Sequence, residues 1–250
     1  MVLSETDDLI NAALILPTQT DSTLSKTGTL QTESFPNTPV DLFGPGGSAG
    51  SSVVALNAQQ PSAEGCLVWP SARLTLKPSA PWKVGFAAGH AKPIQIDSIE
   101  KLSAGDSSSI TAELSKQASV LTVNGDPAFR GLPFTVQKAY RLSMGDTTIL
   151  IGNIVRKINE EATPREERLL LVVERISTTG SYVLSFQSRS AGSEDAVRTS
   201  AVLAAVRFVR TNKAAIVISF EYDDGGQLAL LERIGDHDWR ITWRSAYTGC

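Results

Sequence analysis

The sequence is poor in the side chains that most often build catalytic and metal sites. Its 250 residues include only 2 histidines and 2 cysteines. Zinc sites need several such ligands close together, and nucleophilic catalysis commonly needs a histidine as the base. The phosphate-binding pattern Gly-x-x-x-x-Gly-Lys and the dinucleotide-binding pattern Gly-x-Gly-x-x-Gly are also absent. We therefore expect neither a metal site nor a cofactor.

An excess of one charge and long apolar runs are lacking too. Lysine and arginine total 23 against 26 aspartates and glutamates, which gives a formal net charge of −3. A chain so balanced lacks the basic field that drives nucleic-acid binding, so we expect no nucleic-acid partner. No run approaches the ~18 apolar residues that indicate a membrane-spanning helix. The short apolar run 12–16 follows Asp7 and Asp8, so it lacks the cationic start of a secretory signal.

The two cysteines, Cys66 and Cys250, lie far apart in the sequence. A disulfide between them would close a loop of most of the chain, worth about 5 kcal/mol as an upper figure. Such a bond would indicate an oxidising compartment, either the periplasm or the outside of the cell. Two unpaired thiols would instead indicate the cytoplasm, with Cys66 serving as a small buried apolar residue. Both interpretations stay open from the sequence.

What is present is the composition of a folded chain, with 42% hydrophobic and 20% charged residues. Its first quarter differs from the rest. Residues 17–62 are rich in Ser, Thr, Gly and Pro, and such a stretch buries too little apolar surface to offset its backbone entropy. We therefore interpret residues 1–62 as a short helix followed by an extended arm or linker, and residues 63–250 as one globular domain.

The expected helix at the start covers residues 3–16, because its apolar residues recur on one side. An apolar helix on a flexible arm is typical of segments that order when they bind a partner. The candidate contact residues on this helix are Leu9, Ile10 and Leu14.

Within residues 63–250 the pattern predicts mostly strands. The one clear helix covers 106–121, where Ile110, Leu114, Ala118 and Leu121 form a stripe with helical spacing. From residue 133 onward apolar and polar residues alternate, which favours antiparallel sheets with one buried face. We expect strands over 134–143, 147–158, 169–176 and 182–187, and a three-stranded meander over 214–250; residues 194–208 fit a helix or a strand. The predicted fold class is α+β, mostly antiparallel β with one or two helices.

Residues 159–168 carry many charges and include Pro164, so they are expected to form a solvated hairpin loop or a contact surface for a partner. In the meander, Asp223-Asp224 and Asp236-His237-Asp238 occupy two turns. These turns lie at opposite ends of one strand, so they should not converge on one metal ion. Trp239 and Trp243 are expected on one strand face, either in the core or as a stacking platform for a partner.

Three carboxylates are weak candidates for catalysis, Glu113, Glu174 and Glu232. The last two share strand faces with apolar residues, so they could point inward with raised pKa values, or lie at strand ends in water. The shortage of catalytic residues favours a different hypothesis: a non-catalytic binding or structural module, an accessory subunit that contacts a protein partner through residues 1–62. The alternative is a carboxylate-dependent hydrolase or a small-ligand-binding domain, with a pocket between the helix and the concave sheet.

Overall fold

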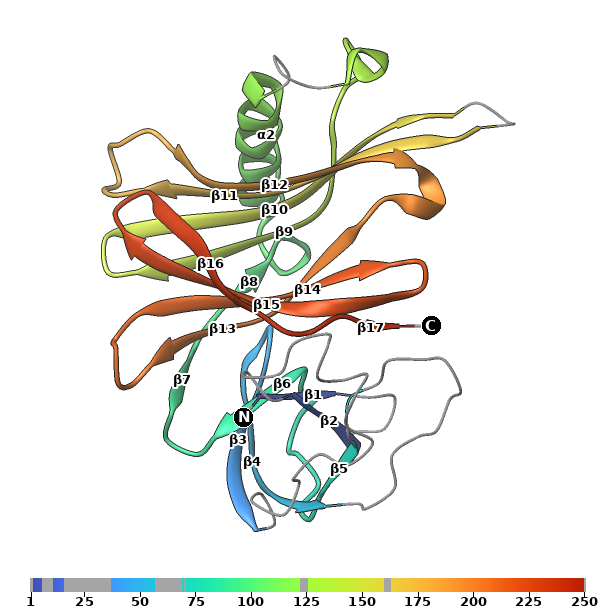
Figure 1. Cartoon of the computed structure of the whole chain (residues 1–250). Helices are drawn as coiled ribbons and strands as arrows, with labels where there is room; N and C mark the ends of the chain where they lie inside the picture. Colours follow the sequence, from blue (N-terminus) through green and yellow to red (C-terminus); the bar gives the residue numbers. More distant parts are fainter. Residues whose placement is uncertain are drawn as a thin grey trace.

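The computed structural model describes residues 2–5, 11–15, 37–56, 69, 71–121, 126–159 and 163–249. Four layers follow one another in Figure 1: a helix, a five-stranded sheet, a six-stranded sheet and a small closed barrel. The strand pairs that the structure describes are all antiparallel, and the described residues contain one α-helix. The expected α+β, mostly antiparallel fold is therefore confirmed. No helix in these ranges has the length and apolarity needed to cross a bilayer.

The barrel is built from the first part of the chain and closes on itself, so it has no open edge. Its strands, in their order around the barrel, are β1 (Val2–Glu5), β2 (Asn11–Ile15), β5 (Ser71–Leu74), β4 (Gly47–Leu56), β3 (Thr38–Gly44) and β6 (Val84–Ala87). Small residues make this tight closure possible. A side chain at Gly85 would place its Cβ 2.9 Å from a methyl carbon of Leu42 and 3.2 Å from the Cβ of Leu3.

The expected helix over residues 3–16 is wrong, because β1 and β2 occupy this region and pair as a hairpin. The interpretation of residues 17–62 as an arm is also corrected, since β3 and β4 lie within it. The Ser- and Gly-rich sequence of β4 provides small residues for the barrel interior, where Ala49 is buried. These strands pair with β5 and β6, so the expected boundary at residue 62 falls inside the barrel.

Two sheets stack face to face above the barrel. The five-stranded sheet has the order β12 (Val183–Ser193), β11 (Arg165–Arg175), β10 (Thr147–Ile158), β9 (Thr135–Met144) and β8 (Asp97–Ser98). The six-stranded sheet contains β16 (Asp238–Arg244), β15 (Gly225–Gly235), β14 (Ala214–Tyr222), β13 (Thr199–Phe208) and β7 (Ala91–Ile94), with β17 (Thr248–Gly249) paired to β15. Isoleucines, valines and leucines from both sheets fill the space between them.

Each face of this sandwich has its own cover. The outer face of the six-stranded sheet packs on the barrel through Phe43, Phe86 and Val217. Helix α2 (Ala104–Val120) covers the outer face of the five-stranded sheet with Ile110 and Leu114. The helix expected over 106–121 is thus confirmed, although it begins two residues earlier.

The start of α2 follows from its cap. The Asp106 backbone N–H donates to Ser103 Oγ at 3.1 Å, so Ser103 caps the helix. Three short 3₁₀ helices complete the described chain: η2 (Ile99–Lys101), η4 (Pro127–Phe129) and η5 (Glu194–Ala196). The segment 194–208, whose sequence fitted a helix or a strand, consists of η5 followed by strand β13.

Candidate functional site

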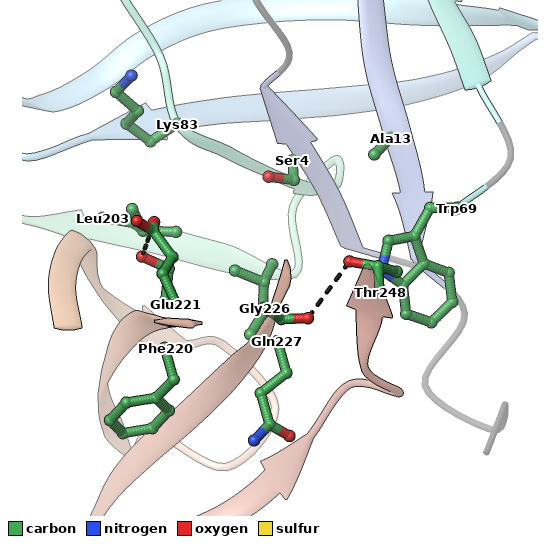
Figure 2. A pocket seen from close by; sticks show the side chains of 12 residues that line it. Ser4, Ala13, Trp69, Lys83, Leu203, Phe220, Glu221, Gly226, Gln227 and Thr248 are labelled. Atoms are coloured by element: carbon green, nitrogen blue, oxygen red, sulfur yellow. Dashed lines mark hydrogen bonds between the residues drawn. The ribbon is translucent and has the colours of Figure 1, made fainter. Parts of the chain in front are cut away.

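A cleft of about 330 Å³ lies between the barrel and the six-stranded sheet. Figure 2 shows it with strand β1 and strand β2 on one side and β14, β15 and β17 on the other. Its lining comes from both ends of the chain: Ser4, Ala13, Trp69, Lys83, Leu203, Ser219, Phe220, Glu221, Gly226, Gln227, Leu228 and Thr248. The cleft therefore exists only because the barrel docks onto the sheet.

The walls of this barrel–sheet cleft combine apolar surface with a few polar groups. Trp69 is buried at the junction and belongs to the same apolar cluster as Leu228. Ser219 Oγ donates to Glu221 Oε1 at 3.0 Å, which orients that carboxylate. Lys83 lines the cleft on the barrel side, and its ammonium group extends away from Glu221 in Figure 2. Apolar walls with a small number of placed polar groups are typical of sites that bind small molecules.

A second groove, of about 190 Å³, lies where the two sheets of the sandwich diverge. Asn153 bridges the sheets there: its Nδ2 donates to the Ser200 carbonyl at 2.9 Å, and its Oδ1 accepts from Ser200 Oγ at 3.0 Å. Basic side chains line the groove on the five-stranded sheet, namely Lys138 and Arg168. Neither of these two cavities lies between α2 and the five-stranded sheet, and the pocket expected there stays a prediction.

Of the three candidate carboxylates, Glu174 is fully buried, with an exposed fraction of 0%. Its two oxygens accept four hydrogen bonds from the opposite sheet. The donors are Arg233 Nε at 2.8 Å, Arg233 Nη2 at 3.2 Å, the His237 backbone N–H at 2.8 Å and Trp239 Nε1 at 2.6 Å. Four charge-assisted bonds use the lone pairs that a general base would need, so this arrangement favours a role in joining the two sheets.

The other two carboxylates lie elsewhere. Glu113 is on helix α2, where its Oε1 accepts from Gln117 Nε2 at 2.8 Å. Glu232 pairs across the strands with Ala215, which faces the barrel, and its carboxylate lies 3.9 Å from Lys213 Nζ. The three carboxylates thus lie in three different parts of the fold, and the structure does not bring any two of them together.

The loop expected over residues 159–168 is wrong in its second half, because strand β11 begins at Arg165. Glu167 is buried and forms ion pairs with Arg156 and Arg189. Glu166 is buried as well, and pairs with Lys157 and Arg168. Burial raises the pKa of Glu166, but these two cations outweigh burial and hold the pKa below its usual range. The sequence signal for paired strands is the pair of cations Arg156 and Lys157 on β10, which lies opposite two glutamates on β11.

Trp239 and Trp243 do not share a face. Trp239 is 3% exposed and packs between the two sheets, whereas Trp243 packs on the barrel side. The reason is a β-bulge: Leu231 pairs with Ile241 and Leu230 with Trp243, so one extra residue of β16 reverses the side of Trp243. The expected stacking platform is therefore wrong, and the core interpretation holds for Trp239.

The remaining candidates are partly outside the described residues. Cys66 and Cys250 both lie outside the described residues, so their pairing stays a prediction. Leu9 and Ile10 also lie outside the described residues. Leu14 is in strand β2, where it pairs with Leu3 of β1. Within the described ranges no group of three or more His, Cys, Asp or Glu side chains could hold a metal ion.

Comparison with protein-family models, with curated proteins and with solved structures gives no match for this chain.

Proposed function

We propose that this protein is a non-catalytic binding module that holds a small amphipathic ligand in the barrel–sheet cleft. The observation that supports this proposal is the cleft itself. Its volume of about 330 Å³ lies within the range of small-molecule sites, roughly 300–1,000 Å³. It also lies at the junction of two separately closed cores, the barrel interior and the sandwich, where ligand sites are common.

The lining indicates the chemistry of the ligand. Trp69, Leu203 and Leu228 offer an apolar wall for an aromatic or aliphatic body. Glu221, fixed by Ser219, is suited to a hydrogen-bond donor or a cation on that ligand. A ligand with an apolar body and a polar or cationic end would therefore satisfy both walls.

A protein partner is the second candidate, and one observation favours it. Residues 1–62, proposed as the contact segment of an accessory subunit, supply one wall of the cleft through Ser4 and Ala13. A side chain of a partner protein inserted at this position would contact these residues directly.

The test is to purify the full-length protein from its native host and to analyse it by native mass spectrometry. A retained molecule below about 1 kDa would support the small ligand, and a retained second chain would support the partner. The variant Ala13→Trp places a large side chain in the cleft. The variant Lys77→Trp adds the same ring at an exposed position beyond β5 and serves as the matched control.

We expect Ala13→Trp to lose the retained molecule and Lys77→Trp to keep it, with both variants folded by circular dichroism. If both variants retain the same molecules in the same amounts, the cleft is not the binding site. If the unaltered protein retains nothing, the proposed binding function is wrong.

A further inference from the structure

Two arginines contact the same aromatic ring at the open edge of the sandwich. The guanidinium carbon of Arg198, just before β13, lies 4.4 Å from the centre of the Phe220 ring. That of Arg244, at the end of β16, lies 5.1 Å from the same centre. Phe220 is 1% exposed, and its ring points away from the barrel side of β14 (Figure 2). Phe220 also belongs to the lining of the barrel–sheet cleft, but neither arginine does.

The two positive charges have no acidic partner in the part of the chain that the structure describes. Other arginines here are neutralised: Arg168 pairs with Glu166, Arg233 with Glu174 and Arg240 with Asp238. Among the residues in the described ranges, Arg198 and Arg244 take part in no ion pair of this kind. Burial, and then the nearby charge of Arg198, lower the pKa of Arg244. The pair therefore holds two like charges together at a free-energy cost that a bound anion would remove.

The surroundings supply neutral donors as well. Arg198 Nη2 donates to Ser188 Oγ, and the Arg198 backbone N–H donates to Ser190 Oγ at 3.0 Å, so both serine hydroxyl hydrogens stay available. A narrow recess beside them is lined by Arg168, Arg198, Ser188, Ser190 and Ser200. It adjoins the groove of Lys138 and Arg168, with which it shares Arg168 and Ser200.

The ring contacts hold the guanidinium groups in place. A planar guanidinium stacked on an aromatic ring keeps its N–H groups directed outward in the ring plane, where they can form paired hydrogen bonds. Arg198 is half-buried and Arg244 is exposed, so an anion in solution can reach both side chains. Two guanidiniums and two or more hydroxyls offer more donors than the two oxygens of one carboxylate can accept. A tetrahedral oxyanion with three free oxygens matches that number better.

We propose that Arg198 and Arg244 form a binding site for the dianionic phosphate group of a small phosphorylated molecule. The site is independent of the barrel–sheet cleft and of the function proposed for it. Phosphate oxygens accept from the two guanidiniums, and Ser188 and Ser190 complete the set of donors. The two negative charges balance the two arginine charges.

The experiment uses the full-length protein and inorganic phosphate as the probe, at pH 8, where phosphate is a dianion. Isothermal titration at constant ionic strength, with chloride as the comparison anion, measures affinity and stoichiometry. We expect one phosphate per chain, and no comparable binding of chloride. No phosphate binding tighter than about 10 mM would overturn the proposal.

Substitutions separate this site from general attraction by positive charge. Arg244→Gln is expected to weaken phosphate binding at least about tenfold, because it removes two charge-assisted hydrogen bonds. Arg198→Gln has the same expected effect, and Arg198→Lys, which keeps the charge, tests the site if the glutamine variant does not fold. Arg240→Gln removes an exposed arginine of the same strand, already paired with Asp238, and should leave binding unchanged. Equal losses in Arg240→Gln and Arg244→Gln would show that only the overall charge matters, which would refute the site.

Discussion

Replacing Glu174 tests whether this buried carboxylate joins the two sheets or takes part in chemistry. Glu174→Gln keeps the size of the side chain and removes its charge, so an amide N–H₂ group must face donors. The bonds from Arg233 and Trp239 are then weakened or lost, at about 1.5–3 kcal/mol for hydrogen bonds to a charged group. Glu174→Ala leaves Arg233 and the indole N–H without this acceptor, and the expected loss is about 3–5 kcal/mol.

Arg233 keeps a second partner, since its Nη2 donates to Asp236 Oδ1 at 2.7 Å. The loss for the alanine variant should therefore lie at the lower end of that range. Trp239→Phe removes the indole donor together with part of the buried ring. The double variant Glu174→Gln/Trp239→Phe should lose less stability than the sum of the two single losses, because both substitutions remove the same hydrogen bond.

The assay is urea unfolding followed by far-ultraviolet circular dichroism. Glu232→Gln is the matched control, because its carboxylate lies 3.9 Å from Lys213, and the expected change is below about 1 kcal/mol. The direction of the stability change in Glu174→Gln distinguishes the joining role from a catalytic role. Catalytic carboxylates are often held at a cost, so replacing one commonly leaves stability unchanged or raises it. A Glu174→Gln protein as stable as the control, or more stable, would refute the joining role.

Two further predictions concern the helix and the C-terminal strands. A Cβ at Gly152 would lie 2.8 Å from a methyl carbon of Leu114, so Gly152→Ala should destabilise the protein by about 1–3 kcal/mol in the same assay. Gly105→Ala is the control, because Gly105 has open space around it and its replacement should not destabilise the protein. The double variant Gly152→Ala/Leu114→Ala should lose less stability than the sum of the two single losses, and full additivity would contradict the clash between these atoms. The hydrogen bond to Asp224 raises the pKa of Tyr247 to about 12, so the stability from this contact should be present below about pH 10 and be lost as pH rises toward 12. In an absorbance titration of Asp224→Asn, this tyrosine should ionise at lower pH. An unchanged titration would show that Asp224 does not cause the shift.

The sandwich could be predicted from the sequence because its strands follow the rule of alternation. Residues 134–143 and 214–222 both formed the expected strands. The expectation of one buried face is wrong for β14, because Ile216 packs between the sheets and Val217 packs against the barrel. The helix followed in the same way from Ile110, Leu114 and Ala118, which are all buried. Here the local pattern and the tertiary packing required the same structure.

The barrel and the candidate sites could not be predicted in this way. The barrel strands are short, and β4 uses glycine, serine and alanine where a usual strand has large apolar residues. Its stability depends on pairing with strands distant in sequence, which no local pattern records. The cleft, the Glu174 contacts and the arginine pair also join residues from distant strands. The reversal of Trp243 depends on a single bulge that an alternating sequence does not reveal.

The closure of the barrel has a consequence for synthesis of the protein on the ribosome. Strand β1 pairs with β6, and Val2 is the partner of Phe86, so the barrel cannot close until Phe86 has been synthesised. At about 5–20 residues per second, the hairpin of β1 and β2 lacks its β6 neighbour in the nascent chain for roughly 4 to 17 seconds. The last three long strands, by contrast, are joined by two tight turns and can pair as soon as they emerge. The start of this chain is therefore the part most in need of protection by chaperones while it is being made.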